Sequence, residues 1–422
     1  MSNAFSKEEV VAFEDYLAAF NDLLTTSRNV SVYNPDSTTM ARANDTIWRP
    51  QPYIGTVGER TVGVAVTATG STQLSVPTTI GYSPNSNFVL NGLELRDALQ
   101  EGRIGDSRMQ QVATYINKKV LDVLAVTSSL TVTRTTAAGT YDDIALCDTI
   151  MTETGVPSDS RVMTLNTRDY NGMAGNLAGR QTMQGKPTSA YERSQVGMVA
   201  GFDTFKADYT KRIRSAAAAT GITMSTLAAA NNYWVPVATQ TAATGEQSNV
   251  DNRFQTITVT DTSAVRAGDR FTIGGSEAVH LIAKEPTGQP KTYTVVSVPS
   301  GTTLVITPPI ISNQGGSDAE EEYQNCVITP NASAPLTFLN YDAAGYNFFW
   351  HKSSVELVTG RYALPNAGPQ ILRASTDQGI EVVMTKFLDT KTFETLYTVD
   401  ALFGVVNLNP EMNGALLFNQ TP

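Results

Sequence analysis

A single long amphipathic segment, from Gly105 to Thr127, limits the folds open to this chain more than any other feature. Its apolar residues recur every three or four positions, which is the spacing of one buried helical face. We predict a helix that is capped by Asp106 or Ser107 and spans roughly 33 Å at about 1.5 Å per residue. The apolar positions are Met109, Val112, Ala113, Ile116, Val120, Val123, Leu124 and Val126. Because such a helix is as long as a small domain is wide, other elements are expected to pack along it.

The segment from Phe5 to Leu24 is predicted to form a second amphipathic helix. Ser6 and Glu9 have the spacing of a capping box at its start. Apolar residues repeat along one narrow stripe, and the remaining surface is acidic and includes Glu14 and Asp15. These carboxylates are either an ordinary solvated face or a docking site for a basic partner helix.

The stretch that follows is predicted to be extended. Residues 29–43 lack periodicity and indicate an arm, whereas residues 46–80 alternate in two blocks, RTVGVAVTAT and TQLSVPTTI. This alternation predicts a long hairpin or loop pair. A two-stranded hairpin has no core of its own and is marginal in water. It therefore needs another surface to lie on, in this subunit or in a neighbour, which is a first hint of assembly.

Helix and strand patterns alternate after the long helix. We predict a helix from Tyr141 to Glu153, a buried strand from Arg161 to Leu165, and a short helix capped by Asn166 or Thr167. From Ala217 to Tyr341 the pattern changes to short β-type runs, which predict a small antiparallel barrel or sandwich inserted into the alternating domain. The runs are FQTITVTD, DRFTIGG, KTYTVVSV and TLVITPPII.

The acidic run from Glu320 to Glu322 is expected to be a solvated turn. In the last part of the chain, VELVT, IEVVMTKF and VVNLN are predicted strands, and Lys391 to Thr398 is predicted to be helical.

The composition excludes several functions for this chain of 422 residues. Its formal net charge of -10 argues against binding nucleic acid through phosphate contacts, which require clustered Lys and Arg. No apolar run is long enough to span a bilayer, and MSNAFSKEEV lacks a signal-peptide pattern, so we expect a cytosolic protein with no membrane partner. Cys147 and Cys326 occur in unrelated contexts and are expected to be buried free thiols.

Catalytic signals are nearly absent. The two histidines, His280 and His351, lie outside any metal-binding motif, and the glycines between 172 and 201 fit no phosphate-binding loop. The acidic pair Asp142 and Asp143 stands at a predicted helix start, where capping explains it better than acid-base chemistry. We therefore expect no enzyme, no cofactor and no metal site.

Seven short motifs, in this order, resemble the major coat proteins of podophages of the Salmonella phage P22 type. They are NDTIWRP at 44–50, NTRDY at 166–170, VAGFD at 199–203, GITMS at 221–225, VDNRF at 250–254, Gly268-Asp269, and NFFW at 347–350. The resemblance is collinear across nearly the whole chain, and no single motif is diagnostic by itself.

The resemblance implies an α+β chain with the Hong Kong 97 capsid fold and an inserted antiparallel β-barrel of the telokin-like type. The implied parts are an N-terminal arm with the amphipathic helix (1–45), an E-loop (46–90), a peripheral domain with the spine helix (91–140), a first part of the axial domain (141–216), the inserted barrel (217–341), a second part of the axial domain (342–390) and a return to the peripheral domain (391–422).

The implied function is that of a major capsid protein in the virion of a tailed phage. Such a protein forms hexamers and pentamers of itself, assembles with a scaffolding protein in the host cytoplasm, and builds an icosahedral shell of triangulation number seven. The shell carries a portal protein at one vertex and encloses double-stranded DNA without sequence-specific binding.

The resemblance also implies contact residues. The acidic pair that binds scaffolding protein aligns with Glu14 and Asp15, and the loop that bridges neighbouring capsomers corresponds to residues 240–252. Its charged candidates are Glu246, Asp251 and Arg253. The E-loop has no lysine between Pro50 and Leu99, so it cannot supply the lysine cross-link of the fold's founding member.

Two other classes of protein fit parts of the sequence. A phage tail component or surface adhesin would also be Thr-rich and β-containing, but it would not need the acidic N-terminal helix. An enzyme with an unrecognised site would behave as a discrete small oligomer.

Overall fold

A computed structural model describes most of the chain, in two compact units. The described residues are 23–35, 46–51, 70–91, 103–179, 197–207, 211–226, 233–362 and 370–422, with single residues 11, 13, 14, 17, 18, 20, 55, 62 and 209. The first unit comprises Met1–Ile47, Thr78–Val120 and Val355–Val406; the second comprises Trp48–Pro77, Leu121–Ser354 and Asn407–Pro422. The predicted capping box of Ser6 and Glu9 lies outside the described residues.

The long helix is confirmed as α3 (Arg103–Thr127), which begins two residues before the predicted start. Met109, Ala113, Ile116 and Val120 are almost completely buried on one face, as their spacing predicted. The capping prediction was wrong: Asp106 and Ser107 lie within the helix, because helical backbone extends back to Arg103.

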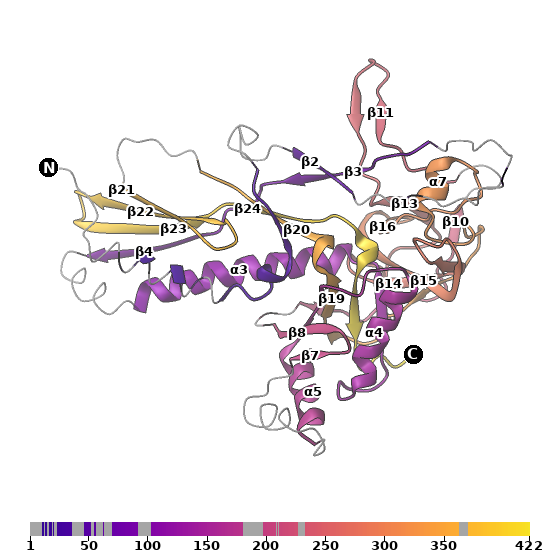
Figure 1. Cartoon of the computed structure of the whole chain (residues 1–422), viewed down its shortest axis with the longest axis horizontal. Helices are drawn as coiled ribbons and strands as arrows, with labels where there is room; N and C mark the ends of the chain where they lie inside the picture. Colours follow the sequence, from indigo (N-terminus) through magenta and orange to yellow (C-terminus); the bar gives the residue numbers. More distant parts are fainter. Residues whose placement is uncertain are drawn as a thin grey trace. The chain divides into compact units, whose positions relative to one another are not determined.

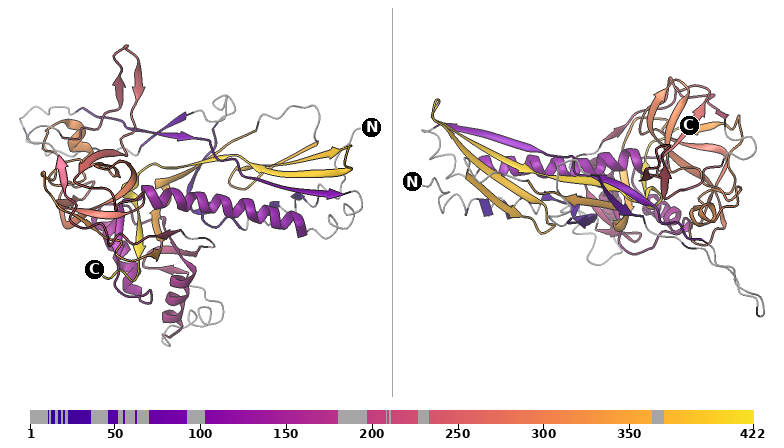
Figure 2. Two further views of the ribbon diagram at one scale, coloured as in Figure 1. Left: turned by 180° about the vertical axis from the view of Figure 1, so that it is seen from behind. Right: turned by 90° about the horizontal axis from the view of Figure 1, so that it is seen from above.

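A four-stranded antiparallel sheet lies along the first-unit part of α3 (Figures 1 and 2). Its order is β21 (Gln370–Ser375), β22 (Glu381–Asp389), β23 (Glu394–Ala401) and β4 (Asn85–Asn91). The helix predicted for residues 391–398 was wrong. In β23, Thr395, Tyr397 and Val399 alternate inward with the period of a strand, and β23 is paired on both sides. Two neighbouring strands thus override a weak local helix preference.

The extended arm is confirmed where it is described. After η1 (Ser27–Asn29), β1 (Ser31–Tyr33) pairs in parallel with β20 (Val355–Thr359), and β24 (Phe403–Asn407) completes a three-stranded sheet. The arm is also held to α3, since Asn117 Nδ2 donates to the Leu23 carbonyl at 2.9 Å.

In the second unit, a six-stranded mixed sheet has the order β5 (Leu130–Thr133), β25 (Asn413–Leu417), β19 (Asn347–His351), β6 (Arg161–Leu165), β8 (Phe202–Lys206) and β7 (Met198–Val199). Its core includes Cys147, a buried free thiol as predicted, whose pKa is raised well above its usual value by burial.

Helices α4 (Tyr141–Glu153) and α5 (Thr167–Gly179) belong to the same part of the second unit. The predicted bounds of α4 and β6 match the structure. Asp143 takes part in a capping box with Thr140, which confirms capping as the role of one member of the acidic pair. Asn166 Oδ1 accepts from the amides of Arg168 and Asp169 at 3.0 Å each, so Asn166 caps α5 as predicted.

The second sheet of this unit contains all four predicted β runs. Its six strands are antiparallel, in the order β10 (Met224–Thr226), β13 (Gln255–Val259), β16 (Thr303–Thr307), β15 (Pro286–Ser300), β14 (Arg270–Val279) and β17 (Leu336–Phe338). A bridge between Thr223 and Pro335 joins the two edges, and the Leu336 amide donates to the Ile222 carbonyl at 2.9 Å. The sheet therefore curls back on itself. Its assignment to a separate domain at 217–341, like the other domain boundaries, stays a prediction.

The remaining elements are short. Three two-stranded pairs are β2 (Thr46–Pro50) with β3 (Ser75–Thr79), β9 (Arg212–Ile213) with β18 (Ala344–Gly345), and β11 (Thr239–Thr241) with β12 (Gln247–Asn249). Single turns of helix are η2 (Lys352–Ser354), η3 (Pro410–Met412) and α7 (Asp318–Tyr323). Of the two alternating blocks predicted at 46–80, the second contains β3, whereas all of the first except Val62 lies outside the described residues.

Helix α7 corrects the expectation of a solvated acidic turn. Glu320 is 0% and Glu322 is 3% exposed. Glu320 closes a capping box with Ser317, whose amide donates to Glu320 Oε2 at 3.0 Å. The acidic run belongs to a helix start because Glu320, the first residue of the run and the third of the helix, reaches back to the cap.

Candidate functional site

The hairpin of β11 and β12 projects from the second unit (Figure 1). Every residue of its two strands is exposed to solvent. Three cross-strand pairs set its register, from Thr239 opposite Asn249 to Thr241 opposite Gln247. Gly245 has φ of +91°, the left-handed conformation that closes the turn, and its amide donates to the Ala242 carbonyl at 2.9 Å. A two-stranded hairpin without buried side chains gains little from its own packing, so it is suited to contact another surface.

The base of this hairpin is held by polar contacts. Asn252 Nδ2 donates to the Val237 carbonyl at 2.8 Å, and Asn252 Oδ1 accepts from the Val237 amide at 3.1 Å. Arg253 forms a bidentate pair with Asp251, with Nε to Oδ1 at 2.9 Å and Nη2 to Oδ2 at 2.6 Å. Arg253 Nη1 also donates to the Asn407 carbonyl at 2.7 Å.

The three charged residues predicted for this loop therefore do not form one cluster. Glu246 lies in the turn and is exposed, and the structure gives it no ion pair with another described residue. Asp251 and Arg253 lie at the base and pair with each other, and the Arg253 side chain is only 9% exposed. The sequence could not reveal this pairing, because an acid and a base two positions apart give the same pattern whether they bind each other or a partner.

The N-terminal acidic residues are only partly described. Glu14 is exposed on helical backbone, whereas Phe13 and Phe20 are 3% and 0% exposed. This is the amphipathic arrangement that the periodicity predicted. Asp15 lies outside the described residues.

An apolar row on the outward face of the first-unit sheet was not predicted. Phe387 pairs with Leu396, which pairs with Val89, so the three side chains point to the same side of the sheet. Phe387 is 53% and Val89 is 51% exposed, and Phe393 in the adjoining turn is 74% exposed. Phe393 also has φ of 56°, a strained conformation for an aromatic residue. We call Val89, Phe387, Phe393 and Leu396 the apolar edge.

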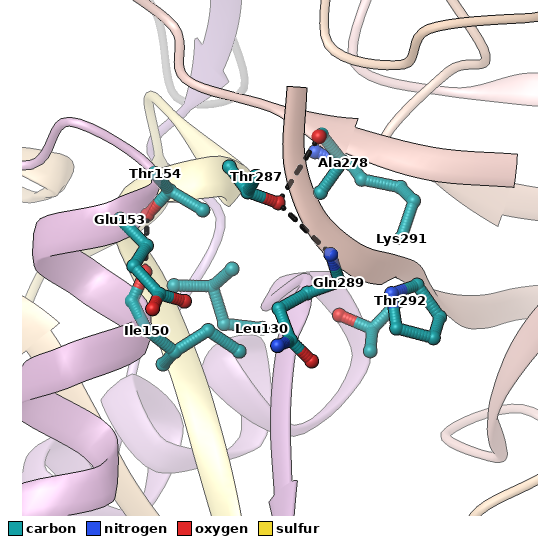
Figure 3. A pocket seen from close by; sticks show the side chains of 10 residues that line it. Leu130, Ile150, Glu153, Thr154, Ala278, Thr287, Gln289, Lys291 and Thr292 are labelled. Carbon is teal, nitrogen blue, oxygen red and sulfur yellow. Dashed lines mark hydrogen bonds between the residues drawn. The ribbon is translucent and has the colours of Figure 1, made fainter. Parts of the chain in front are cut away.

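Two cavities lie in the described part of the second unit. One narrow pocket is formed by α4, β5 and the start of β15 (Figure 3). Its polar contacts are local, since Thr287 Oγ1 donates to the Ala278 carbonyl at 3.1 Å and accepts from the Gln289 amide at 3.3 Å.

A wider cavity of about 350 Å³ lies at the start of α5. Asp169, which lines it, accepts hydrogen bonds from Asn166 and Asn347 and thereby links α5 to β19. Burial raises the pKa of Asp169 above its usual value, and these two hydrogen bonds oppose the rise. Asp169 therefore holds α5 to β19, which gives the Asn166 and Asp169 positions of the NTRDY motif a structural role.

Neither histidine is part of a metal site among the described residues, where no group of His, Cys, Asp and Glu side chains could hold a metal ion. His280 Nδ1 accepts from the Ala283 amide at 3.0 Å. His351 Nδ1 lies 2.7 Å from Ser353 Oγ, and burial lowers the pKa of His351. In the same described part of the chain, no helix is long and apolar enough to cross a membrane.

Comparisons with known proteins complete these observations. The family model described as P22 coat protein - gene protein 5 matches residues 1–419. A solved structure of Mycobacterium phage Che8 is similar over 94% of this chain and 90% of its own, with 10% identity and a TM-score of 0.43. The capsid of cyanophage P-SCSP1u is similar over 93% and 87%, with 10% identity and a TM-score of 0.44. The CUS-3 coat protein I-domain covers 28% of this chain and 95% of its own, with 35% identity and a TM-score of 0.22.

Proposed function

We propose that this chain, which belongs to the P22 coat protein family, builds an icosahedral procapsid from hexamers and pentamers of itself with the help of a scaffolding protein. It is a major capsid protein of a tailed bacteriophage, and the fold is of the Hong Kong 97 type. The observation that carries the proposal is the family match, which leaves only three of the 422 residues uncovered at the C-terminus (422 − 419 = 3).

The experiment that tests the proposal is electron microscopy of the protein expressed with and without its scaffolding partner. Closed shells are expected when both proteins are present. Only small monodisperse particles under every condition would count against the proposal.

For the scaffolding contact, we propose Glu14 and Asp15. The exposure of Glu14 opposite buried phenylalanines supports this role, because its carboxylate is available to a basic partner. Replacing both by lysine should slow scaffold-dependent assembly, measured by light scattering, while the monomer stays folded. The single variant Glu14→Lys should show the same effect in weaker form. Its control is Glu153→Lys, which makes the same charge change at an exposed residue at the end of α4. Unchanged assembly kinetics would discard the role.

For contacts between capsomers, we propose the hairpin of β11 and β12. Its support is the full exposure of both strands and the hydrogen-bonded base at Asn252. Asp251 and Arg253 then act by holding the base, and contact is made mainly by polar backbone and side chains near Glu246. This arrangement relies on many weak contacts instead of strong ion pairs.

For contacts between copies within the shell, we propose the apolar edge. Large apolar side chains that remain more than half exposed in a single chain mark surfaces that association covers. The strained turn at Phe393 supports the same role, since strain of this kind persists where function requires it.

The remaining parts of the proposal concern the finished particle. The shell, of triangulation number seven, carries a portal protein at one vertex and encloses DNA without sequence-specific binding. The net charge of -10 supports mere enclosure. The protein acts structurally, without catalysis, in the virion after assembly in the host cytoplasm.

A further inference from the structure

The short acidic helix α7 contacts a segment that lies far away in the sequence. The segment, residues 70–74, leads into β3 and forms the returning limb of the predicted E-loop. The Gly70 amide donates to Asp318 Oδ2 at 2.7 Å, and the Thr72 amide donates to Glu322 Oε2 at 2.9 Å. In the opposite direction, the Tyr323 hydroxyl donates to the Thr72 carbonyl at 2.8 Å. Three hydrogen bonds therefore attach the extended backbone of residues 70–72 to α7.

An apolar contact continues this attachment. Leu74 is 2% exposed and packs in one cluster with Ile311 and Tyr323, against which Trp234 is partly buried. The Leu74 carbonyl accepts from the Gln51 amide at 2.9 Å, which connects the returning limb to the outgoing one at the end of β2. The limb is thus held by polar contacts at 70–72 and by burial at 74. Figure 1 shows this segment running from β3 to the side of α7.

The carboxylates of α7 and the backbone amides of residues 70–72 are chemically complementary. A carboxylate as buried as that of Glu322 needs hydrogen-bond donors, and extended backbone without a strand partner has free amides to give. Gly70 allows the close approach, because a Cβ at this position would lie only 3.1 Å from Asp318 Oδ2. Glu321, on the exposed side of the same helix, takes no part in these three hydrogen bonds.

We propose that α7 is a clasp that positions the E-loop of its own subunit before assembly, with Asp318, Glu322 and Tyr323 as the positioning residues. This inference rests on the proposed function and adds to it a step before assembly, in which α7 positions the E-loop. An unheld limb would have to be ordered at the moment of association, and that ordering entropy would weaken the contact with a neighbour. The clasp removes this entropy cost from the association step, because residues 70–74 are already ordered in the monomer.

The first test is hydrogen exchange on the full-length monomer, which does not depend on assembly. The Asp318→Ala and Glu322→Ala double variant should lower the protection of the Gly70 and Thr72 amides roughly ten- to a hundredfold, as expected for hydrogen bonds to charged groups. Tyr323→Phe should have a smaller effect, and Glu321→Gln should have none. Unchanged amides in β13 to β16 would show that the variants are folded. Wild-type protection at both positions in the double variant would overturn the clasp.

The second test is the rate of shell formation with scaffolding protein. The double variant should assemble about tenfold more slowly than wild type, because only the fraction with an ordered limb is competent. Glu321→Gln should assemble at the wild-type rate. Loss of amide protection together with wild-type assembly would overturn the positioning role. If the wild type itself formed no shells, the proposed function would fail, whereas the exchange result would still decide whether the clasp exists.

Discussion

The buried ion pair between Lys291 and Glu411 allows a quantitative test of how the second unit is held together. Lys291 lies on β15 and is 3% exposed, and Glu411 lies in η3, directly before β25, and is 13% exposed. The pair therefore connects the curled sheet to the C-terminal strand of the mixed sheet. Both charges have left water, so each depends on the other for compensation.

Removing one partner should be costly, and the two single variants should differ. Lys291→Met leaves the Glu411 carboxylate, which still feels the positive charge of Lys284 nearby. Glu411→Gln leaves a nearly inaccessible ammonium group. We expect losses in the free energy of unfolding of about 3 kcal/mol for Lys291→Met and about 4 kcal/mol for Glu411→Gln.

The double variant Lys291→Met with Glu411→Leu should lose only about 1 kcal/mol, because no charge then remains buried. The measurement is urea unfolding of the monomer followed by fluorescence, analysed as a double-mutant cycle. Losses that simply add, or single variants that cost less than about 1 kcal/mol, would refute the view that these charges compensate each other.

Three further predictions concern single features. Burial lowers the pKa of Lys284 to about 8 from its usual 10.5, so between these values the unfolded chain holds more protons on this amine than the folded chain does, and stability should rise with pH. The full shift corresponds to about 3.4 kcal/mol, and the partial exposure of the amine to solvent reduces the expected rise to about 2 kcal/mol. Lys284→Met should abolish this rise in unfolding experiments from about pH 7 to 10.5. Deleting residues 241–248 should leave the melting temperature of the monomer unchanged but weaken shells toward urea, and shells of normal resistance would contradict the bridging role of the hairpin. Replacing Phe387 and Phe393 by serine should lower monomer stability by only about 1 kcal/mol, because both rings are more than half exposed, yet it should impair shell formation; normal assembly would remove the apolar edge from the interface.

The sequence by itself determined the elements whose signals are local. Helix α4 and strand β6 have their predicted bounds, and α3 differs only at its start, because periodicity and capping chemistry act within a few residues. The four β runs of the curled sheet were equally clear, since each is bounded by turn residues. The family resemblance, confirmed by the match over residues 1–419, rested on motifs with local roles of this kind, such as Asn166 at its cap.

Only the tertiary structure decided which segments pair with each other and which side chains stay exposed to a partner. Residues 394–401 became a strand because partners on both sides outweighed local preference, and Arg253 became part of a hairpin base because Asp251 and the Asn407 carbonyl lie beside it. Glu322 became buried because the chain brings the amide of Thr72 to its carboxylate across 250 positions. Pairings of this kind depend on contacts between segments far apart in the sequence. A local sequence pattern does not specify which distant segment makes the contact.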